Sequence, residues 1–413
     1  MPHTETISLQ SYVQSTFSSL GIRNYRIFFW AQLASLSGNW VRLVAVTWLV
    51  LQLHASGTML GIVTGLQFLP SLLIGPVAGV VADRMPKRQL IAITQSVMGL
   101  CSLALAIIVG MHIVQLWMVM AIVFVAGIAN AFDMPACQTL IADLVDKTHV
   151  RNAITLEALE SNVARIIGPS IGAICLTHFT ITSCFAVDAL SFVCTLIAIG
   201  MLRPHEFFAN KIIPRAKGQF HEGWAYLRQN ATVRTILLTM TLVGTFACEF
   251  FVTLPLLAKV TLHGDATTYA AMTTAMGSGA IAAGLYIARK ATPMRVETLA
   301  QYAMIMALSM VLTALTPSYG VVLLMLFVVG ASQLALTTSA NTMLMLHTSP
   351  AMRGRMSGWW VMIFVGSTPI GGPLMGWVAQ VGTPGLALIV GASATAIAGG
   401  WMYARRPVLT PAT

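Results

Sequence analysis

Long apolar runs separated by short polar segments make up most of the chain. Each run has roughly the 20 residues that an α-helix needs to cross a bilayer, and the sequence supplies about a dozen of them. The runs consist of Leu, Val, Ile, Ala, Met and Gly, without the period-two alternation that is typical of a membrane β-barrel. The pattern therefore predicts an all-α polytopic membrane protein.

Basic residues in the polar segments predict the topology. Of the 23 Lys and Arg residues, all but Arg42, Arg165 and Lys259 fall in clusters that recur after two crossings and a turn. All clusters therefore lie on one side, and positive charge in short loops marks the cytoplasmic side. Six helical hairpins then give twelve membrane helices, with both termini in the cytoplasm. The clusters are 23–26, 84–88, 147–151, 203–234, 289–295, 353–355 and 405–406.

The composition supports this class and excludes others. Only 9% of the residues are charged, against roughly 25% in a soluble domain. The net charge of +10 is explained by the clusters, so we expect no nucleic-acid partner. The six cysteines form no CxxC pair, which predicts packing roles and no metal or cofactor. No HExxH or plausible GxSxG is present, so we do not expect an enzyme. Residues 1–24 lack the apolar core of a cleavable signal peptide.

Three sequence landmarks recur at a nearly constant offset. "FVAGIANAF" at position 124 returns as "FVVGASQLA" at 327, "IGPSIG" at 167 as "GGPLMG" at 371, and "GVVADR" at 79 as "GLYIAR" at 284. The repeat predicts two six-helix halves, which is typical of a transporter that rocks around a central site. The expected segments are a cytoplasmic N-terminal segment (1–24), two bundles (25–202 and 235–404), a cytoplasmic linker (203–234) with the amphipathic helix "HEGWAYLRQN", and a tail (405–413).

The stretch "GPVAGVVADRMPKR" predicts a gate at the cytoplasmic end of the second helix. Gly75 and Gly79 lie four residues apart, so two helix backbones can approach closely there. Asp83 can cap the N-terminus of a neighbouring helix. Arg84 can pair with an acid on another helix, for which Asp143 and Asp146 are candidates. A purely topogenic loop would explain the basic residues but neither Asp83 nor the glycines.

"GVVADRMPKR" resembles the loop 2–3 motif of the major facilitator superfamily, with Pro86 in place of the usual glycine. "RIIGPSIG" resembles the antiporter motif of that superfamily. Longer stretches, among them "FLPSLLIGPVAGVVADR" and "NAITLEALESNVARIIGPSIGA", are similar to the branch that holds siderophore exporters and macrolide or multidrug efflux pumps. The resemblance implies gating roles for the GPxxG residues of both halves and for the preceding arginine: Arg165, Gly168, Pro169, Gly172, Gly372, Pro373 and Gly376.

The resemblance also implies the mode of action. We expect a monomer in the inner membrane that exports a small molecule and uses the proton gradient, without a cofactor. Two alternatives stay open. One is a transporter of an organic anion or a lysophospholipid, for which Arg42 and Arg165 would suit a carboxylate or phosphate. The other is a membrane sensor that does not transport, which is disfavoured because the chain has no soluble domain long enough to signal.

Ionisable groups at mid-depth are costly and are therefore functional candidates. Arg42 lies near the middle of the first helix, and Asn39 lies one turn earlier. Asp133 lies near the middle of a helix expected over 117–141 and either carries the exchanged proton or pairs permanently with Arg42. Glu249 is the only acid deep in the second half and is the other candidate carrier of the exchanged proton. The resemblance places helices 1, 4, 7 and 10 around the cavity, so we expect these groups to line it.

Helix 5 carries two further candidates for the substrate cavity. Glu157 and Glu160 lie one turn apart and near the cytoplasmic end, where they either mark substrate preference or are simply hydrated. Arg165 on the same helix is expected to be structural or to take part in gating. Asp188 on helix 6 is expected to be structural.

Overall fold

The computed structural model describes residues 17–53, 56–208, 219–289, 295–349 and 352–405. These residues are almost entirely helical, and no strand occurs among them. Eleven helical segments are long and apolar enough to cross a membrane. A twelfth, α6, has 29 residues but is more polar because it carries Glu157, Glu160 and Arg165. The predicted all-α polytopic fold with twelve membrane helices is confirmed.

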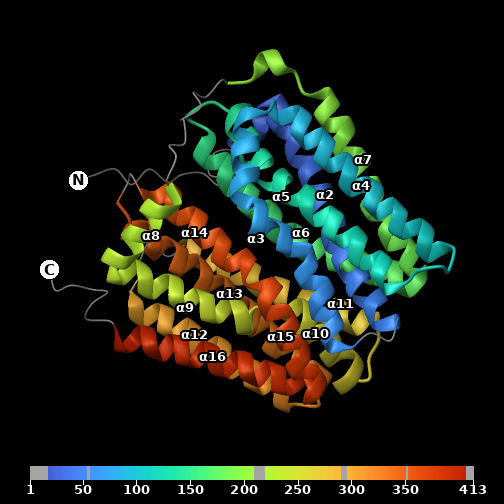
Figure 1. The fold of residues 1–413 in the computed structure, drawn as a ribbon, viewed down its shortest axis with the longest axis vertical. Helices are drawn as coiled ribbons and strands as arrows, with labels where there is room; N and C mark the ends of the chain where they lie inside the picture. Colours follow the sequence, from blue (N-terminus) through green and yellow to red (C-terminus); the bar gives the residue numbers. More distant parts are fainter. Residues whose placement is uncertain (1–16, 54–55, 209–218, 290–294, 350–351, 406–413) are drawn as a thin grey trace, which may run out of the picture.

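The first six membrane helices lie together in one half of the molecule (Figure 1). They are α2 (Arg23–Gln52), α3 (Gly57–Arg84), α4 (Lys87–Gly110), α5 (Leu116–Leu144), α6 (Val150–His178) and α7 (Ile181–Met201). Two short helices flank this half, η1 (Ser18–Gly21) and η2 (Pro204–Glu206).

The second half follows α8 (Gln219–Gln229). Its seventh crossing is broken into three pieces and its eleventh into two. The helices are α9 (Ala231–Ala247), α10 (Phe250–Leu256), η3 (Leu257–Thr261), α11 (Ala266–Arg289), α12 (Val296–Leu315), α13 (Tyr319–Leu346), α14 (Arg353–Gly366), α15 (Thr368–Val381) and α16 (Pro384–Ala404).

The loops define two ends of the molecule. We call the end that holds the loops around residues 84–88, 144–150 and 346–353 the basic end, and the opposite one the far end. Helix α8 lies at the basic end beside α14. There the side chain of Glu222 forms an ion pair with Arg355, and the rings of Trp224 and Trp359 lie 5.7 Å apart. The short helix expected from "HEGWAYLRQN" therefore docks on the second half.

Helices within each half pack through apolar and small side chains. Because lipid is as apolar as the protein interior, close packing and small residues hold such helices together. The contact of α11 with α13 shows this most directly: a Cβ atom added at Gly330 would lie only 1.8 Å from the carbonyl oxygen of Met276. In the first half, α3 approaches α5 in the same way at Gly127, against the carbonyl of Gln67.

Candidate transport site at the interface of the two halves

The two halves meet where α3 runs beside α15, toward the far end (Figure 1). A Cβ atom added at Gly61 would lie 2.2 Å from the carbonyl oxygen of Gly372, and one added at Gly376 would lie 2.2 Å from that of Gly57. Glycine is required for so close an approach of two helix backbones. We call this contact the glycine seam; its members are Gly57, Gly61, Gly65, Pro369, Gly372 and Gly376.

Polar contacts between the halves also lie at the far end. Lys259 Nζ in η3 donates a hydrogen bond of 2.7 Å to the carbonyl oxygen of Leu51, in the last turn of α2. A cation suits this place because the C-terminal end of a helix carries partial negative charge. The backbone N–H and the hydroxyl of Thr58 both donate to Gln380 Oε1, at 3.2 and 2.7 Å. The far end is thus closed by backbone packing and by hydrogen bonds.

A second contact between the halves joins α6 to α11. A Cβ atom added at Gly277 would lie 3.0 Å from Ile166 and 3.4 Å from the carbonyl oxygen of Arg165. The hydroxyls of Ser170 and Thr274 are 3.4 Å apart. In the internal repeat, α6 corresponds to α15 and α11 corresponds to α3. The contact between α6 and α11 is therefore the equivalent of the contact between α15 and α3, with the two halves exchanged.

The basic end of α3 makes no comparable contact. A Cβ atom added at Gly75 would meet no atom of the described residues within 4 Å. The close helix approach expected at Gly75 is therefore absent in this conformation. Gly79 is half-buried and Arg84 is exposed. The side chain of Asp83 lies outside the described part of the structure, so its capping role stays a prediction.

Arg84 forms no ion pair with either expected acid, Asp143 or Asp146, among the described residues, and a pairing that forms only when the basic end closes stays a prediction. Asp143 forms an ion pair with Lys87 instead, which comes from the same basic cluster but starts the next helix, α4. Asp146 accepts hydrogen bonds from its own loop, and the Thr148 hydroxyl lowers the pKa of Asp146 to about 2. Both acids therefore stabilise the basic end of the first half and do not bridge the halves.

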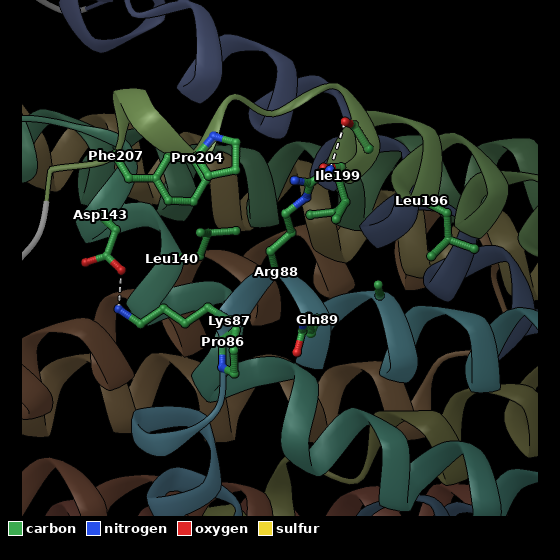
Figure 2. A pocket seen from close by; sticks show the side chains of 12 residues that line it. Pro86, Lys87, Arg88, Gln89, Leu140, Asp143, Leu196, Ile199, Pro204 and Phe207 are labelled. Carbon is green, nitrogen blue, oxygen red and sulfur yellow. Dashed lines mark hydrogen bonds and ion pairs between the residues drawn. The ribbon is translucent and has the colours of Figure 1, made fainter.

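Figure 2 shows a pocket beside this ion pair, with a volume of about 640 Å³, between α4, α5 and α7. Lys87 points toward Asp143 on one side of it. Arg88 donates from Nε to the carbonyl oxygen of Ile199 at 2.8 Å and from an Nη to that of Gly200 at 2.9 Å, at the end of α7. Pro204 of η2 and Phe207, which follows η2, line the pocket together with residues of the first half. The pocket therefore does not lie between the two halves.

The two GPxxG motifs pack in different directions. A Cβ atom added at Gly168 would lie 2.7 Å from a carbonyl oxygen of α2, and Gly172 also faces α2. The first motif therefore joins α6 to a helix of its own half. Gly372 and Gly376 of the second motif belong to the glycine seam and face α3 of the other half. Each motif also places a proline inside its helix, Pro169 in α6 and Pro373 in α15.

Arg42 forms a buried ion pair with Asp188, not with Asp133. Its Nε lies 3.1 Å from Asp188 Oδ2, and the two side chains are 4% and 0% exposed. An Nη of Arg42 donates to Asn39, and Ser102 donates to the same oxygen of Asp188. The alternative in which Asp133 is the permanent partner of Arg42 is therefore wrong. Both partners of the observed pair, on α2 and α7, belong to the first half.

Asp133 lies inside the first half with three donors around it. Thr94 Oγ1 is 2.6 Å from Oδ1, Gln95 Nε2 is 3.0 Å from Oδ2, and Cys137 Sγ is 3.6 Å from Oδ2. These groups come from α4 and α5. A carboxylate that accepts several hydrogen bonds can be buried at modest cost. The surroundings of Asp133 therefore suit a fixed, ionised group.

Glu249 has the opposite surroundings. It is 2% exposed and lies at the break between α9 and α10. Neither of its carboxyl oxygens has a hydrogen-bond partner of normal geometry among the described residues, although the Thr368 hydroxyl lies nearby. Its oxygens face the backbone of α15: a Cβ atom at Gly371 would lie 2.7 Å from Oε1, and one at Gly372 would lie 3.6 Å from Oε2. Glu249 therefore lies directly behind the glycine seam.

The acids of α6 point into the first half. Glu160 is 3% exposed, and its Oε1 has no partner in the described part of the chain. Glu157 is partly buried one turn earlier. Both lie within electrostatic range of Tyr25, whose hydroxyl donates to the carbonyl oxygen of Ala153. Neither acid belongs to the glycine seam.

Arg165 lies where helices of both halves converge. Its guanidinium covers the ring of Trp40 on α2, 5.4 Å from the centroid. The same ring lies 5.6 Å from that of Phe251 on α10. Cys248 is within electrostatic range of Arg165 and accepts a hydrogen bond from Gln333 on α13. Of this group, sequence reasoning missed Phe251 and Gln333, which are ordinary residues in apolar runs.

Gly372 and Gly376 were expected to be gate residues, but the α3 side of the glycine seam was missed, although the sequence contains a sign of it. Gly57, Gly61 and Gly65 follow one another at the same spacing as the glycines of the basic end. Lys259 stood out only as a cation outside the basic clusters. The sequence shows that close contacts can form at both ends of α3 but does not show which end is closed.

A family model described as "Transmembrane secretion effector" matches residues 14–409. The chain belongs to this family of the major facilitator superfamily. Two relatives within the superfamily are the staphyloferrin A transporter of Staphylococcus aureus, 25% identical over 63% of this chain and 66% of that protein, and macrolide efflux protein A of Streptococcus pyogenes, 23% identical over 62% and 64%. The chain thus spans just under two thirds of the length of each of these relatives.

A solved structure shows the same fold. The bacterial homologue to the human lysosomal transporter Spinster, in an inward-facing and unoccupied conformation, superposes with a TM-score of 0.69 at 14% identity, over 94% of this chain and 95% of that one. The family and the fold together identify a multi-pass membrane protein of the major facilitator superfamily.

Proposed function

We propose that this protein exports small amphipathic molecules by alternating access and uses the proton gradient as its energy source. It acts as a monomer in the inner membrane and needs no cofactor. The basic end faces the cytoplasm, because positive charge in short loops marks that side. The names of the relatives, a siderophore transporter and a macrolide efflux protein, support an outward direction of transport.

The observation that carries the proposal is the difference between the two ends. The glycine seam and the hydrogen bonds of Lys259 and Thr58 close the far end. At the basic end, Gly75 makes no close contact with another helix among the described residues. Two halves that rock around a central site break contacts at one end and form them at the other. The structure then corresponds to a state that is closed to the outside.

Glu249 carries the exchanged proton in this proposal. A buried carboxylate without well-formed hydrogen bonds is costly, so Glu249 is neutral while the seam is closed. Loss of its proton places a negative charge against the backbone of Gly371 and Gly372, which weakens the seam. Asp133 is less suited to the role, because its three donors stabilise the ionised form.

The test uses purified protein in liposomes with an imposed pH gradient. Internal pH is recorded while an ethidium-like cation, a macrolide or a catecholate siderophore is added. We expect at least one of them to trigger proton movement, and we expect Glu249→Gln to abolish that movement. Asp133→Asn is the matched control among buried acids and should retain it. Proton movement that survives Glu249→Gln but not Asp133→Asn would reverse the assignment.

Transport of an organic anion is the second candidate function. The observation that favours it is Arg165, an arginine in the interior with no acid beside it. A sensor without transport activity is disfavoured, since the contacts between the halves are built from glycines that allow repeated separation.

A further inference from the structure

Two arginines lie in the membrane interior, and they differ in their partners. Arg42 is neutralised by Asp188 and is hydrogen-bonded to Asn39. Arg165 forms no ion pair and no hydrogen bond with any described residue, and its Nε is buried. Cys248 is the one titratable group within electrostatic range of it in the described part of the chain. Arg165 is thus a partly covered interior cation that has no counter-charge among the described residues.

Arg165 has neighbours from both halves of the molecule. The side chain is only partly covered, and its neighbours come from both halves: Trp40 on α2, Phe251 on α10, and Cys248 between α9 and α10. Its own backbone carbonyl lies against Gly277 of α11. A ligand in contact with this guanidinium would therefore touch both halves.

The acids of the same helix do not neutralise Arg165. Glu160 precedes it by five residues, and at about 100° per residue the two side chains are turned about 140° apart around α6. Glu160 lies toward Tyr25, inside the first half. Both side chains belong to the same helix, so a rotation of α6 would not bring Glu160 to Arg165.

The surroundings of Arg165 select an anion over a cation. A guanidinium presents a planar fork of donors that matches a carboxylate, and pairing offsets the cost of its burial. A lipophilic cation would be repelled by Arg165.

We propose that Arg165, together with Trp40 and Phe251, forms an anion subsite at the interface of the halves. The transported molecule then carries a carboxylate next to an aromatic or apolar group: the carboxylate pairs with the Arg165 guanidinium, and the apolar part packs against the two rings. This inference rests on the proposed transport function where it calls the bound molecule a substrate. Binding of an anion at the subsite does not depend on transport.

The test is a binding measurement in detergent, which needs no transport and no gradient. Isothermal titration calorimetry compares 2-naphthoate with 2-naphthamide, a neutral molecule of the same shape. We expect the wild-type protein to bind the carboxylate at least about tenfold more tightly, since truncating one partner of a buried charge pair commonly costs more than that factor. Arg165→Gln should remove the preference, and Arg165→Lys should retain part of it. Arg405→Gln, which removes a cation at the exposed end of α16, should leave it unchanged.

Each outcome decides the proposal. Equal affinity of the wild-type protein for the two probes overturns it, and this result does not depend on whether any variant folds. An unchanged preference in folded Arg165→Gln, shown by circular dichroism and size-exclusion chromatography, also overturns it. Anion binding through Arg165 without substrate-triggered proton movement would leave the subsite intact and contradict only the proposed coupling.

Discussion

The two ends of α3 carry the same kind of sequence but have different surroundings. At the far end, Gly57 and Gly61 lie in backbone contact with α15. At the basic end, Gly75 has the same four-residue spacing to Gly79, but a Cβ atom added at Gly75 would meet no atom of the described residues within 4 Å. Small residues at a four-residue spacing therefore mark surfaces that can be in contact, and the conformation decides which of them are. In the proposed alternating access, each end of α3 would make its close contact in a different state.

The largest expected effect is that of breaking the seam while leaving the open end alone. Gly61→Val places a side chain against the carbonyl of Gly372, where even a Cβ would lie at 2.2 Å. The conformation in which the far end is closed should no longer form. Transport into liposomes should then fall more than about tenfold, because a shift of about 1.4 kcal/mol already changes an equilibrium constant tenfold. Leu73→Val, at an exposed position of the same helix, is the control. An equal loss in both variants would mean that the effect does not come from the seam.

The second prediction separates the two GPxxG motifs. Gly376→Ala disturbs a contact between the halves, and Gly168→Ala disturbs a contact inside one half. We expect Gly168→Ala to lower the melting temperature more, and Gly376→Ala to lower the transport rate several-fold with little change in melting temperature. Fluorescence-detected thermal unfolding and transport measured on the same preparations test this. Identical profiles of the two variants would argue against a division of labour between the motifs.

A smaller effect is expected for the hydrogen bond of Lys259 to Leu51. Lys259 is exposed, so the bond contributes about 1 kcal/mol. Lys259→Met should shift the far end toward the open state about fivefold. Accessibility of a cysteine placed at Thr58 to a membrane-impermeant maleimide measures that shift. Unchanged labelling in Lys259→Met would show that the bond does not hold the far end.

The smallest effect is expected at the contact of Thr58 with Gln380. The two groups are accessible to water, which replaces their hydrogen bonds at little cost. Gln380→Leu should therefore change the transport rate by less than about twofold. A loss as large as that of Gly61→Val would place the main closing contact in these side chains instead of the backbone.

Helices, their number and their grouping could be predicted because membrane crossings require long apolar runs, and the basic clusters repeat at that length. The partner of Arg42 could not be predicted, since Asp133 and Asp188 both lie in apolar runs of the same half. The outcome depends on how α4, α5 and α7 are turned about their axes. Packing between neighbouring helices, with no clear trace in a single sequence, sets that rotation.

The polar surroundings of the buried acids could not be predicted from the sequence either. Asp133 and Glu249 look alike as single acids in apolar runs, yet Asp133 has three donors, whereas Glu249 has only the Thr368 hydroxyl nearby and no hydrogen bond of normal geometry among the described residues. The break between α9 and α10 places Glu249 behind the seam, and the sequence gives no clear sign of this break. The likeness to the major facilitator superfamily predicted the fold and the glycine motifs. It did not predict which end of the molecule is closed.

The most direct test of alternating closure is a pair of distances measured by double electron–electron resonance. Spin labels at Met59 and Val381 report on the far end, and labels at Arg84 and Ser357 report on the basic end, after replacement of the six free cysteines. The resting protein should show a short far-end distance and a long basic-end distance. Gly61→Val should lengthen the first and shorten the second. If both distances change in the same direction, or if only the far end responds, the two ends of α3 are not coupled and the account is contradicted.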